Sequence, residues 1–352
     1  MAVPELLRKL LSAPGPSGYE AAAAAVWREA AEGFAKVTSD AMGSSVARVA
    51  GTADGPLLVV LGHIDEIGLM VTHVDDDGFV FFLTVGGTRA DVLHAQRVEV
   101  ATKGGPVPGV IGRKGGKRLK PGEKPVQLEL EDLHIDIGAR DRKQALELLQ
   151  IGDVAVLATE PVELAAGRLA SRSLDNRLGA YVALEAARKV AEAGGSPGEV
   201  AAVAAVQEEV GDFAGARTSV FALEPKVALA VDVTGATDIP DGDPKVDGEA
   251  KLGGGPIVNR GSTINPKVFE LLVETAEAEE IGYTVNVSAG DTHTDMDAAY
   301  TSRAGVATGL ISLATRYIHT PGEVVSLDDV EATVRLVAAF AQRLEPGLDF
   351  TR

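Results

Sequence analysis

The 352-residue sequence contains no cysteine. Disulfide bonds and thiolate metal sites are therefore excluded, and any metal ion would have to be held by His, Asp and Glu side chains. The lack of cysteine also fits a reducing compartment, so we expect the protein to be cytoplasmic.

Long apolar runs and basic residues are scarce as well. No stretch reaches the 18 consecutive apolar residues typical of a transmembrane helix, and the N-terminal leucines are separated by charges, unlike those of a signal peptide. The 33 Lys and Arg residues are outnumbered by 51 Asp and Glu, which gives a formal charge of −18. Because phosphate binding requires basic patches, this balance argues against a nucleic-acid partner and favours attraction of cations.

Helix and strand patterns alternate at both ends of the chain. Helical patterns occupy residues 175–195, 265–282 and 327–344, and apolar strand patterns occupy residues 199–207 and 226–233. Such alternation predicts a mainly parallel, mixed sheet flanked by helices. With 45% hydrophobic residues, the chain has ample material for a large core.

Residues 68–161 have a different pattern, with short alternating stretches between Gly and Pro residues. Asp77 and Gly78 predict a hairpin turn between two of these stretches. A basic loop at residues 112–125 interrupts them. We therefore expect an α/β domain formed by residues 1–67 and 162–352, with a small β-barrel inserted at residues 68–161.

Residue types that bind metals follow the predicted strands, at the point where each strand ends. The carboxyl ends of parallel strands meet at one edge of a sheet, where functional groups gather. We therefore expect the side chains that follow or end four predicted strands to lie close together, and these are His63, Asp65, Glu208, Glu209, Asp232 and His319.

Several candidate residues have an ordinary structural explanation when each is taken alone. His63 could be a hydrogen-bonded histidine at a strand end, and His319 could be structural. Asp232 could be a capped or salt-bridged carboxylate. Asp175, which lies just before the helical pattern at residues 175–195, could be an N-cap, because Asp is favoured there.

Taken together, the residues fit a site for two metal ions. Two divalent ions that share one bridging carboxylate, with a His and a carboxylate on either side, need five protein ligands. The sequence offers five such residues: His63, Asp175, Glu209, Asp232 and His319. Neighbouring side chains along a strand point to opposite faces, so Glu208 is left free beside Glu209 as a general base. Asp65 lies two residues from His63, faces the same way, and either fixes the tautomer of that imidazole or lies close beside it.

Several stretches of the chain resemble one known family. They are collinear between about residues 60 and 330 and include "GHIDEIGLMV", "SLDNRLGAY", "EEVGDFAGA" and "GVATGLISLATRYIHTP". In these stretches the sequence resembles the tetrahedral and glutamyl aminopeptidases, a family of metallopeptidases with two co-catalytic metal ions.

The resemblance implies a role for each candidate residue. His63 and Asp232 would hold one ion, and Glu209 and His319 would hold the other. Asp175 would bridge the two ions, and a cis peptide bond would join it to Asn176. Asp65 would orient His63, and Glu208 would be the catalytic base.

The resemblance also implies properties of the whole protein. The fold would be of the zinc-peptidase type, with a PDZ-like barrel at residues 68–161 that serves dimerisation and assembly. The cofactors would be two divalent ions per subunit, zinc or cobalt. The substrates would be peptides, and the homo-oligomer would be built of dimers that form a dodecamer.

The sequence departs from the family in two places. The family often has a short "GTDA"-like motif, which is replaced here by "SAGDTHTDMDAAYTSRAG". Thr294 and Asp295 match the core of that motif, so we expect them near the substrate pocket. The extra His293 is better explained as an exposed loop residue. The basic loop at residues 112–125 stands where relatives often carry a Pro-Pro-His sequence.

The sequence therefore predicts a metal-dependent aminopeptidase that uses a metal-activated water and a glutamate base. A deacylase or a dipeptidase would use the same site. A glycosidase also uses paired carboxylates, but adjacent glutamates fit poorly the spacing that sugar cleavage requires. A non-catalytic assembly protein with a structural metal is the remaining alternative, although structural zinc sites are closed by four ligands and have no use for a spare base.

Overall fold

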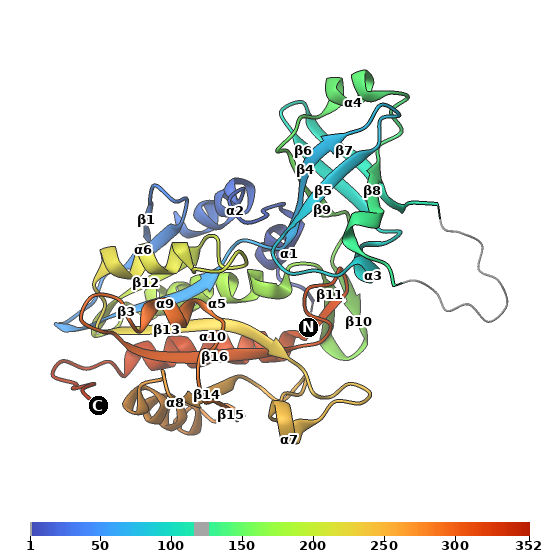
Figure 1. The fold of residues 1–352 in the computed structure, drawn as a ribbon. Helices are drawn as coiled ribbons and strands as arrows, with labels where there is room; N and C mark the ends of the chain where they lie inside the picture. Colours follow the sequence, from blue (N-terminus) through green and yellow to red (C-terminus); the bar gives the residue numbers. More distant parts are fainter. Residues whose placement is uncertain (1, 116–126) are drawn as a thin grey trace.

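The computed structural model describes residues 2–115 and 127–352, so residues 116–125 of the expected basic loop lie outside the described residues. The body of the molecule is built on an eight-stranded sheet (Figure 1). In spatial order its strands are β1 (Lys36–Ser39), β2 (Ser45–Val49), β12 (Gly198–Ala205), β3 (Gly55–His63), β13 (Val227–Gly235), β16 (Ala307–Thr315), β14 (Ile257–Gly261) and β15 (Thr284–Ser288).

The centre of this sheet is parallel and its margins are mixed. Strands β12, β3, β13 and β16 run parallel to one another. Strand β2 pairs antiparallel with β12, and β14 pairs antiparallel with β16. The central strands are almost entirely apolar because helices cover both of their faces. The prediction of a mixed sheet flanked by helices is confirmed.

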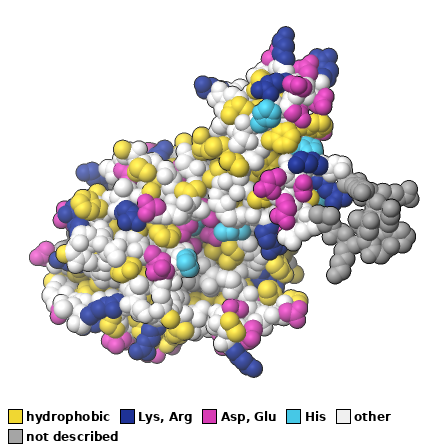
Figure 2. All heavy atoms as spheres, viewed as in Figure 1, with side chains coloured by type: hydrophobic (Ala, Val, Ile, Leu, Met, Phe, Trp, Pro, Cys, Tyr) yellow, Lys and Arg dark blue, Asp and Glu magenta, His cyan; other side chains and the backbone are white. Residues whose placement is uncertain are grey.

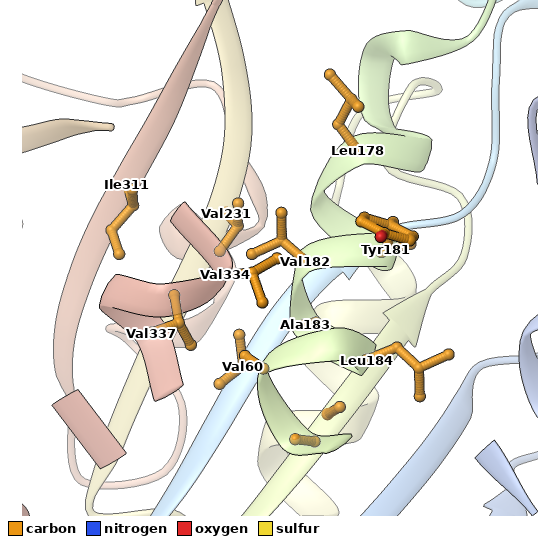
Figure 3. Packing of buried hydrophobic residues seen from close by; sticks show 14 of the residues in the cluster. Val60, Leu178, Tyr181, Val182, Ala183, Leu184, Val231, Ile311, Val334 and Val337 are labelled. Carbon is orange, nitrogen blue, oxygen red and sulfur yellow. The ribbon is translucent and has the colours of Figure 1, made fainter. Parts of the chain in front are cut away.

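Alternate residues of the central strands pack against different helices. Leu58 and Val60 of β3 belong to the core on one face, which also contains residues of the helices α1 (Glu5–Ser12), α2 (Ala21–Ala31), α5 (Leu174–Glu192), α8 (Pro266–Ala278) and α10 (Leu327–Gln342). Val59 and Leu61 face α6 (Ala214–Leu223) and α9 (Asp295–Ala299). Figure 3 shows the first of these cores, where Val182 of α5 points toward Val231 of β13 and Val334 of α10.

A closed six-stranded barrel stands beside the body of the molecule (Figure 1). In order around the barrel the strands are β4 (Gly68–Val74), β5 (Val80–Val85), β8 (Leu133–Asp136), β7 (Gly105–Arg113), β6 (Arg97–Thr102) and β9 (Val154–Leu157). The barrel has an apolar core of its own and carries the short helices α3 (Ala90–Leu93) and α4 (Arg142–Leu148). A small inserted barrel is thus confirmed, whereas its PDZ-like type and the domain boundaries stay predictions.

The predicted hairpin turn at Asp77 and Gly78 connects β4 to β5. Gly78 has a φ of 89°, a left-handed conformation that glycine adopts without steric cost. Strand pairing across the turn runs from Val74 opposite Val80 to Gly68 opposite Val85. Strand β4 therefore starts at Gly68, as the sequence predicts.

The sequence did not predict a third, small sheet, which contains β10 (Val162–Leu164), β11 (Arg168–Ser171) and β17 (Glu323–Ser326). Figure 1 shows β10 and β11 below the barrel, and the short helix α7 (Pro244–Asp247) at the lower margin of the body. In the part of the chain that the structure describes, no helix is both long enough and apolar enough to cross a bilayer.

Candidate metal centre

Four of the five predicted ligands come from the carboxyl ends of the four parallel strands, and the fifth, Asp175, lies at the start of α5. His63 is the last residue of β3 and lies opposite Ala205, the last residue of β12. Glu208 and Glu209 follow shortly after β12, whereas Asp232 lies within β13. Figure 2 shows acidic and histidine side chains together at the middle of the molecule, below the barrel.

Asp175 lies between two histidines. One of its carboxylate oxygens, Oδ1, lies 3.2 Å from Nε2 of His63. The other, Oδ2, lies 3.3 Å from Nε2 of His319. The carboxylate thus presents a different oxygen to each imidazole, which is the arrangement that a ligand bridging two cations requires.

The two adjacent glutamates face different histidines. Oε2 of Glu209 lies 3.2 Å from Nε2 of His319, and Oε2 of Glu208 lies 3.7 Å from Nε2 of His63. Asp232 approaches His63 from the same side as Glu208, with Oδ1 at 3.9 Å from Nε2. Two groups of ligand atoms therefore lie within reach of a single ion, one from His63, Asp175 and Glu209 and the other from His63, Glu208 and Asp232.

The start of α5 shows why Asp175 is available to the site. The regular helix begins after Asp175 and Asn176, which have non-helical dihedral angles and are joined by a cis peptide bond, as the resemblance implied. The side chain of Asn176 accepts a hydrogen bond from N–H of Gly179 and donates one to the carbonyl of Val231. Asn176, rather than Asp175, therefore satisfies a backbone N–H in the first turn, and the carboxylate of Asp175 is directed to the histidines.

Asp65 is fully buried and has more contacts than the sequence indicated. Its Oδ1 lies 3.4 Å from Nδ1 of His63, but within the described residues this nitrogen has no hydrogen-bond partner, so the orienting role stays a prediction. Its carboxylate also accepts hydrogen bonds from the backbone N–H groups of Glu208 and Glu209, both at 3.1 Å, and from the hydroxyl of Ser17 at 2.6 Å. Asp65 therefore fixes the turn that carries the two glutamates and lies against His63.

Sequence reasoning missed several buried acids around this centre. Glu20 accepts from N–H of Gln207, the residue before Glu208. Glu66 is paired with the buried guanidinium groups of Arg172 and Arg177. Glu323 accepts from the backbone of two predicted ligands. The available signal was a charged residue beside an apolar stretch, which marks Glu323 in "GEVVS".

The carboxylates of the centre lie close together with little positive charge nearby. Burial raises the pKa of Glu208 to about 10, and the charges of Asp232 and Asp295 add to the rise. Burial likewise raises the pKa of Asp232 well above its usual range. Contacts with Asp175 and then Glu209 raise the pKa of His319 to about 11. Among the described residues, the ion pairs of these carboxylates involve only histidines.

These side chains fit divalent cations. Imidazole and carboxylate oxygens are the ligands that zinc and cobalt accept in the absence of thiolates. Oε1 of Glu209 is buried and has no hydrogen-bond partner in the described part of the chain. Like-charged carboxylates that crowd together cannot all ionise unless positive charge is added. The donor set, the orphaned oxygen and the shifted pKa values therefore all fit a site for cations.

Thr294 and Asp295 lie at the start of α9, close to this centre. The hydroxyl of Thr294 accepts from N–H of Met296 and so caps the helix. Asp295 is buried, and neither of its carboxylate oxygens has a hydrogen-bond partner within residues 2–115 and 127–352. The extra His293 is exposed, and its N–H donates to Asp297. A substrate-binding role for Thr294 and Asp295 stays a prediction.

A family model and several similar aminopeptidases point to one family. The family described as M42 glutamyl aminopeptidase matches residues 43–336. Lysyl aminopeptidase from Pyrococcus furiosus is 34% identical over 354 residues, which cover 99% of each chain. A TET aminopeptidase structure from the marine sediment archaeon Thaumarchaeota archaeon SCGC AB-539-E09 has a TM-score of 0.91 and 34% identity, over 97% of this chain and 96% of that one. The TET1 peptidase of Pyrococcus horikoshii, described as assembling into a tetrahedron or a large octahedral shell, has a TM-score of 0.84 and 30% identity over 97% and 99%.

Proposed function

This chain belongs to the M42 glutamyl aminopeptidase family of peptide hydrolases, and we propose that it removes N-terminal residues from peptides at a centre of two divalent metal ions. The observation that carries the proposal is the position of Asp175, whose two carboxylate oxygens face His63 and His319 separately.

We assign the ligands as the resemblance to the aminopeptidase family implies, and the contacts between these side chains are compatible with that assignment. His63 and Asp232 would hold one ion, and Glu209 and His319 would hold the other, with Asp175 bridging. Zinc and cobalt both suit these nitrogen and oxygen ligands. Ions held there would polarise the scissile carbonyl and lower the pKa of a water molecule from ~15.7 towards ~7.

Glu208 is the proposed general base. It lies next to a proposed ligand in the sequence but faces His63, and its backbone N–H is fixed by Asp65. Its carboxylate would take a proton from the attacking water and pass it to the leaving amine. Burial raises the pKa of Glu208, so the carboxylate binds a proton readily. The positive charge of bound metal ions would favour its ionised form, in which it can accept a proton from water and later return it.

The fold supports further proposals about the whole protein. We propose that residues 1–67 and 162–352 form the catalytic domain, of zinc-peptidase type, and that residues 68–161 form a PDZ-like domain used in assembly. Dimers that combine into a dodecamer are the expected form, since TET relatives form large shells. The mass of the particle in solution, compared with the 36.4 kDa chain, tests this proposal. A cytoplasmic location is proposed from the absence of cysteine.

The test of function is a substrate panel under metal control. The protein is stripped with a chelator, reloaded with zinc or cobalt, and assayed on unblocked aminoacyl substrates, dipeptides and N-acetylated peptides. A lysyl substrate belongs in the panel because of the name of the Pyrococcus furiosus relative. We expect activity that disappears on stripping, returns with metal, and requires a free amine.

Other outcomes identify the alternatives. Cleavage of only the acetylated substrates would indicate a deacylase, and cleavage of only the dipeptides a dipeptidase on the same site. Hydrolysis of a glycoside that survives the chelator would indicate a glycosidase. A protein that binds metal and is inert towards every substrate would be a non-catalytic assembly protein.

A further inference from the structure

We propose that Glu323 is a positioning residue that sets the main chain of two proposed ligands, Asp175 and His319, and thereby controls the affinity for one of the two ions. The inference rests on the proposed metal centre. Glu323 itself is assigned no contact with substrate and no role in proton transfer.

The carboxylate of Glu323 connects two segments that are far apart in the chain. Its Oε2 accepts from the backbone N–H of Asp175 at 3.1 Å, and its Oε1 accepts from the backbone N–H of His319 at 2.9 Å. The residue is 2% exposed, so water does not compete for these bonds. Asp175 and His319 are also the residues whose side chains meet at 3.3 Å. One carboxylate thus holds both main chains behind that contact.

The backbone of Glu323 is held in turn by the small sheet. Glu323 is the first residue of β17 and lies opposite Ser171, the last residue of β11. The chain continues from Ser171 to Asp175 within the same short segment. The position of Glu323 relative to Asp175 is therefore fixed by strand pairing, and only its side chain has to reach His319.

The backbone at both ligands requires such support. His319 has a φ of 62°, a left-handed conformation that costs a non-glycine residue energy unless its surroundings enforce it. Asp175 lies outside the regular hydrogen-bonding pattern of α5, because its dihedral angles are not helical. The bonds to Glu323 therefore stabilise two irregular positions at once.

A second buried carboxylate does the same on the other side of the centre. Asp65 accepts the backbone N–H groups of Glu208 and Glu209, as Glu323 accepts those of Asp175 and His319. Groups that orient metal ligands typically change metal affinity by ~10–100-fold when they are removed. We therefore expect an effect of that size from Glu323.

The test is the substitution Glu323→Gln in the full-length protein. An amide has one acceptor oxygen and one NH₂ donor, so the variant can satisfy one of the two N–H groups and places a donor against the other. The control is Asp329→Asn, because Asp329 is also a buried carboxylate that accepts two backbone N–H groups, those of Gly253 and Gly255, in another part of the fold.

The readout is zinc binding by the stripped proteins, measured by competition with a chromogenic chelator. We expect Asp329→Asn to bind each of the two ions as tightly as wild type does. We expect Glu323→Gln to bind one of the two ions ~10–100-fold more weakly than wild type does. Equal binding of both ions by Glu323→Gln and wild type would overturn the inference. Fewer than two ions on the wild type would instead refute the proposed centre, and the inference with it.

A measurement on the wild type decides the matter if Glu323→Gln does not fold. Residue-resolved hydrogen exchange of the stripped wild-type protein reports on the amides of Asp175 and His319 directly. Slow exchange at both amides is expected, because both donate to a buried carboxylate. Exchange as fast as that of an exposed loop amide, such as that of His293, would overturn the inference.

Discussion

Nε2 of His319 lies 3.3 Å from Oδ2 of Asp175. The two side chains come from segments at opposite ends of the catalytic region, one following β16 and one at the start of α5. The other carboxylate oxygen of Asp175, Oδ1, faces the imidazole of His63. The contact between His319 and Asp175 therefore belongs to one of the two proposed ion sites, and a substitution of His319 should affect that site and not the other.

His319→Ala is expected to remove one ion and leave the other. The imidazole and Glu209 are the proposed ligands of that ion beside the bridge, and a carboxylate pair alone binds zinc more weakly. Elemental analysis of the purified variant should give about one ion per chain, against two for wild type. His293→Ala is the control, because His293 is exposed and should keep both ions. Two retained ions in His319→Ala would contradict the assignment.

Glu208→Gln is expected to keep both ions and to lose turnover. The amide has nearly the shape of the carboxylate but cannot take a proton from water, and a general base contributes ~10²–10⁴-fold to the rate. The measurements are kcat on an unblocked aminoacyl substrate and metal content of the same sample. Near-normal kcat with full metal content would show that the base is another group.

Asp295 is expected to make the stability of the metal-free protein depend on pH. Burial raises its pKa from the usual 3.8 to about 7. The folded state therefore binds the proton more tightly than the unfolded state does. Its contribution to stability is full below the unfolded pKa and is lost as pH rises through about 7.

Asp295→Asn is neutral at every pH and should lack this contribution. Urea unfolding of stripped wild type and variant at pH 5 and pH 8, at one protein concentration, gives the comparison. We expect wild type to lose more stability than the variant between the two values. Equal losses of unfolding free energy in the two proteins would show that the pKa of Asp295 is not raised in solution.

Glu66→Ala is expected to destabilise the fold strongly. Glu66 is buried between Arg172 and Arg177, and its removal leaves two guanidinium groups without their carboxylate. Breaking a buried ion pair in this way costs ~3–5 kcal/mol of unfolding free energy. Glu163→Ala is the control, because Glu163 pairs with Arg8 at 48% and 44% exposure and should cost ~0–1 kcal/mol. Denaturant midpoints that shift equally in both variants would argue against a buried network.

The sequence alone indicated that four of the proposed ligands, all except Asp175, would lie at one edge of the sheet. His63 ends an apolar strand, Glu209 and His319 follow apolar strands, and parallel strands deliver such residues to a single edge. The inserted barrel was predictable from short alternating stretches between Gly and Pro residues, and the hairpin at Asp77 and Gly78 from the turn preference of these two residues. Both inferences use signals carried by neighbouring residues.

The support behind the ligands could not be predicted in the same way. Strand β10 has three exposed residues and β17 has four buried ones, so neither shows the alternation that reveals a strand. The contacts of Glu323 and Asp65 are to backbone N–H groups, which every residue type other than proline provides. No pattern of side chains indicates such partners, and the fold must be known before they are found.

The proposed ligands also span most of the chain, from His63 to His319. During synthesis, the first of them leaves the ribosome while the last has not yet been translated. A nascent chain therefore cannot assemble the proposed centre until β16 and the loop after it have emerged. The same holds for any fragment cut before residue 319, which would lack one of the proposed ligands and, with it, the proposed activity on peptides.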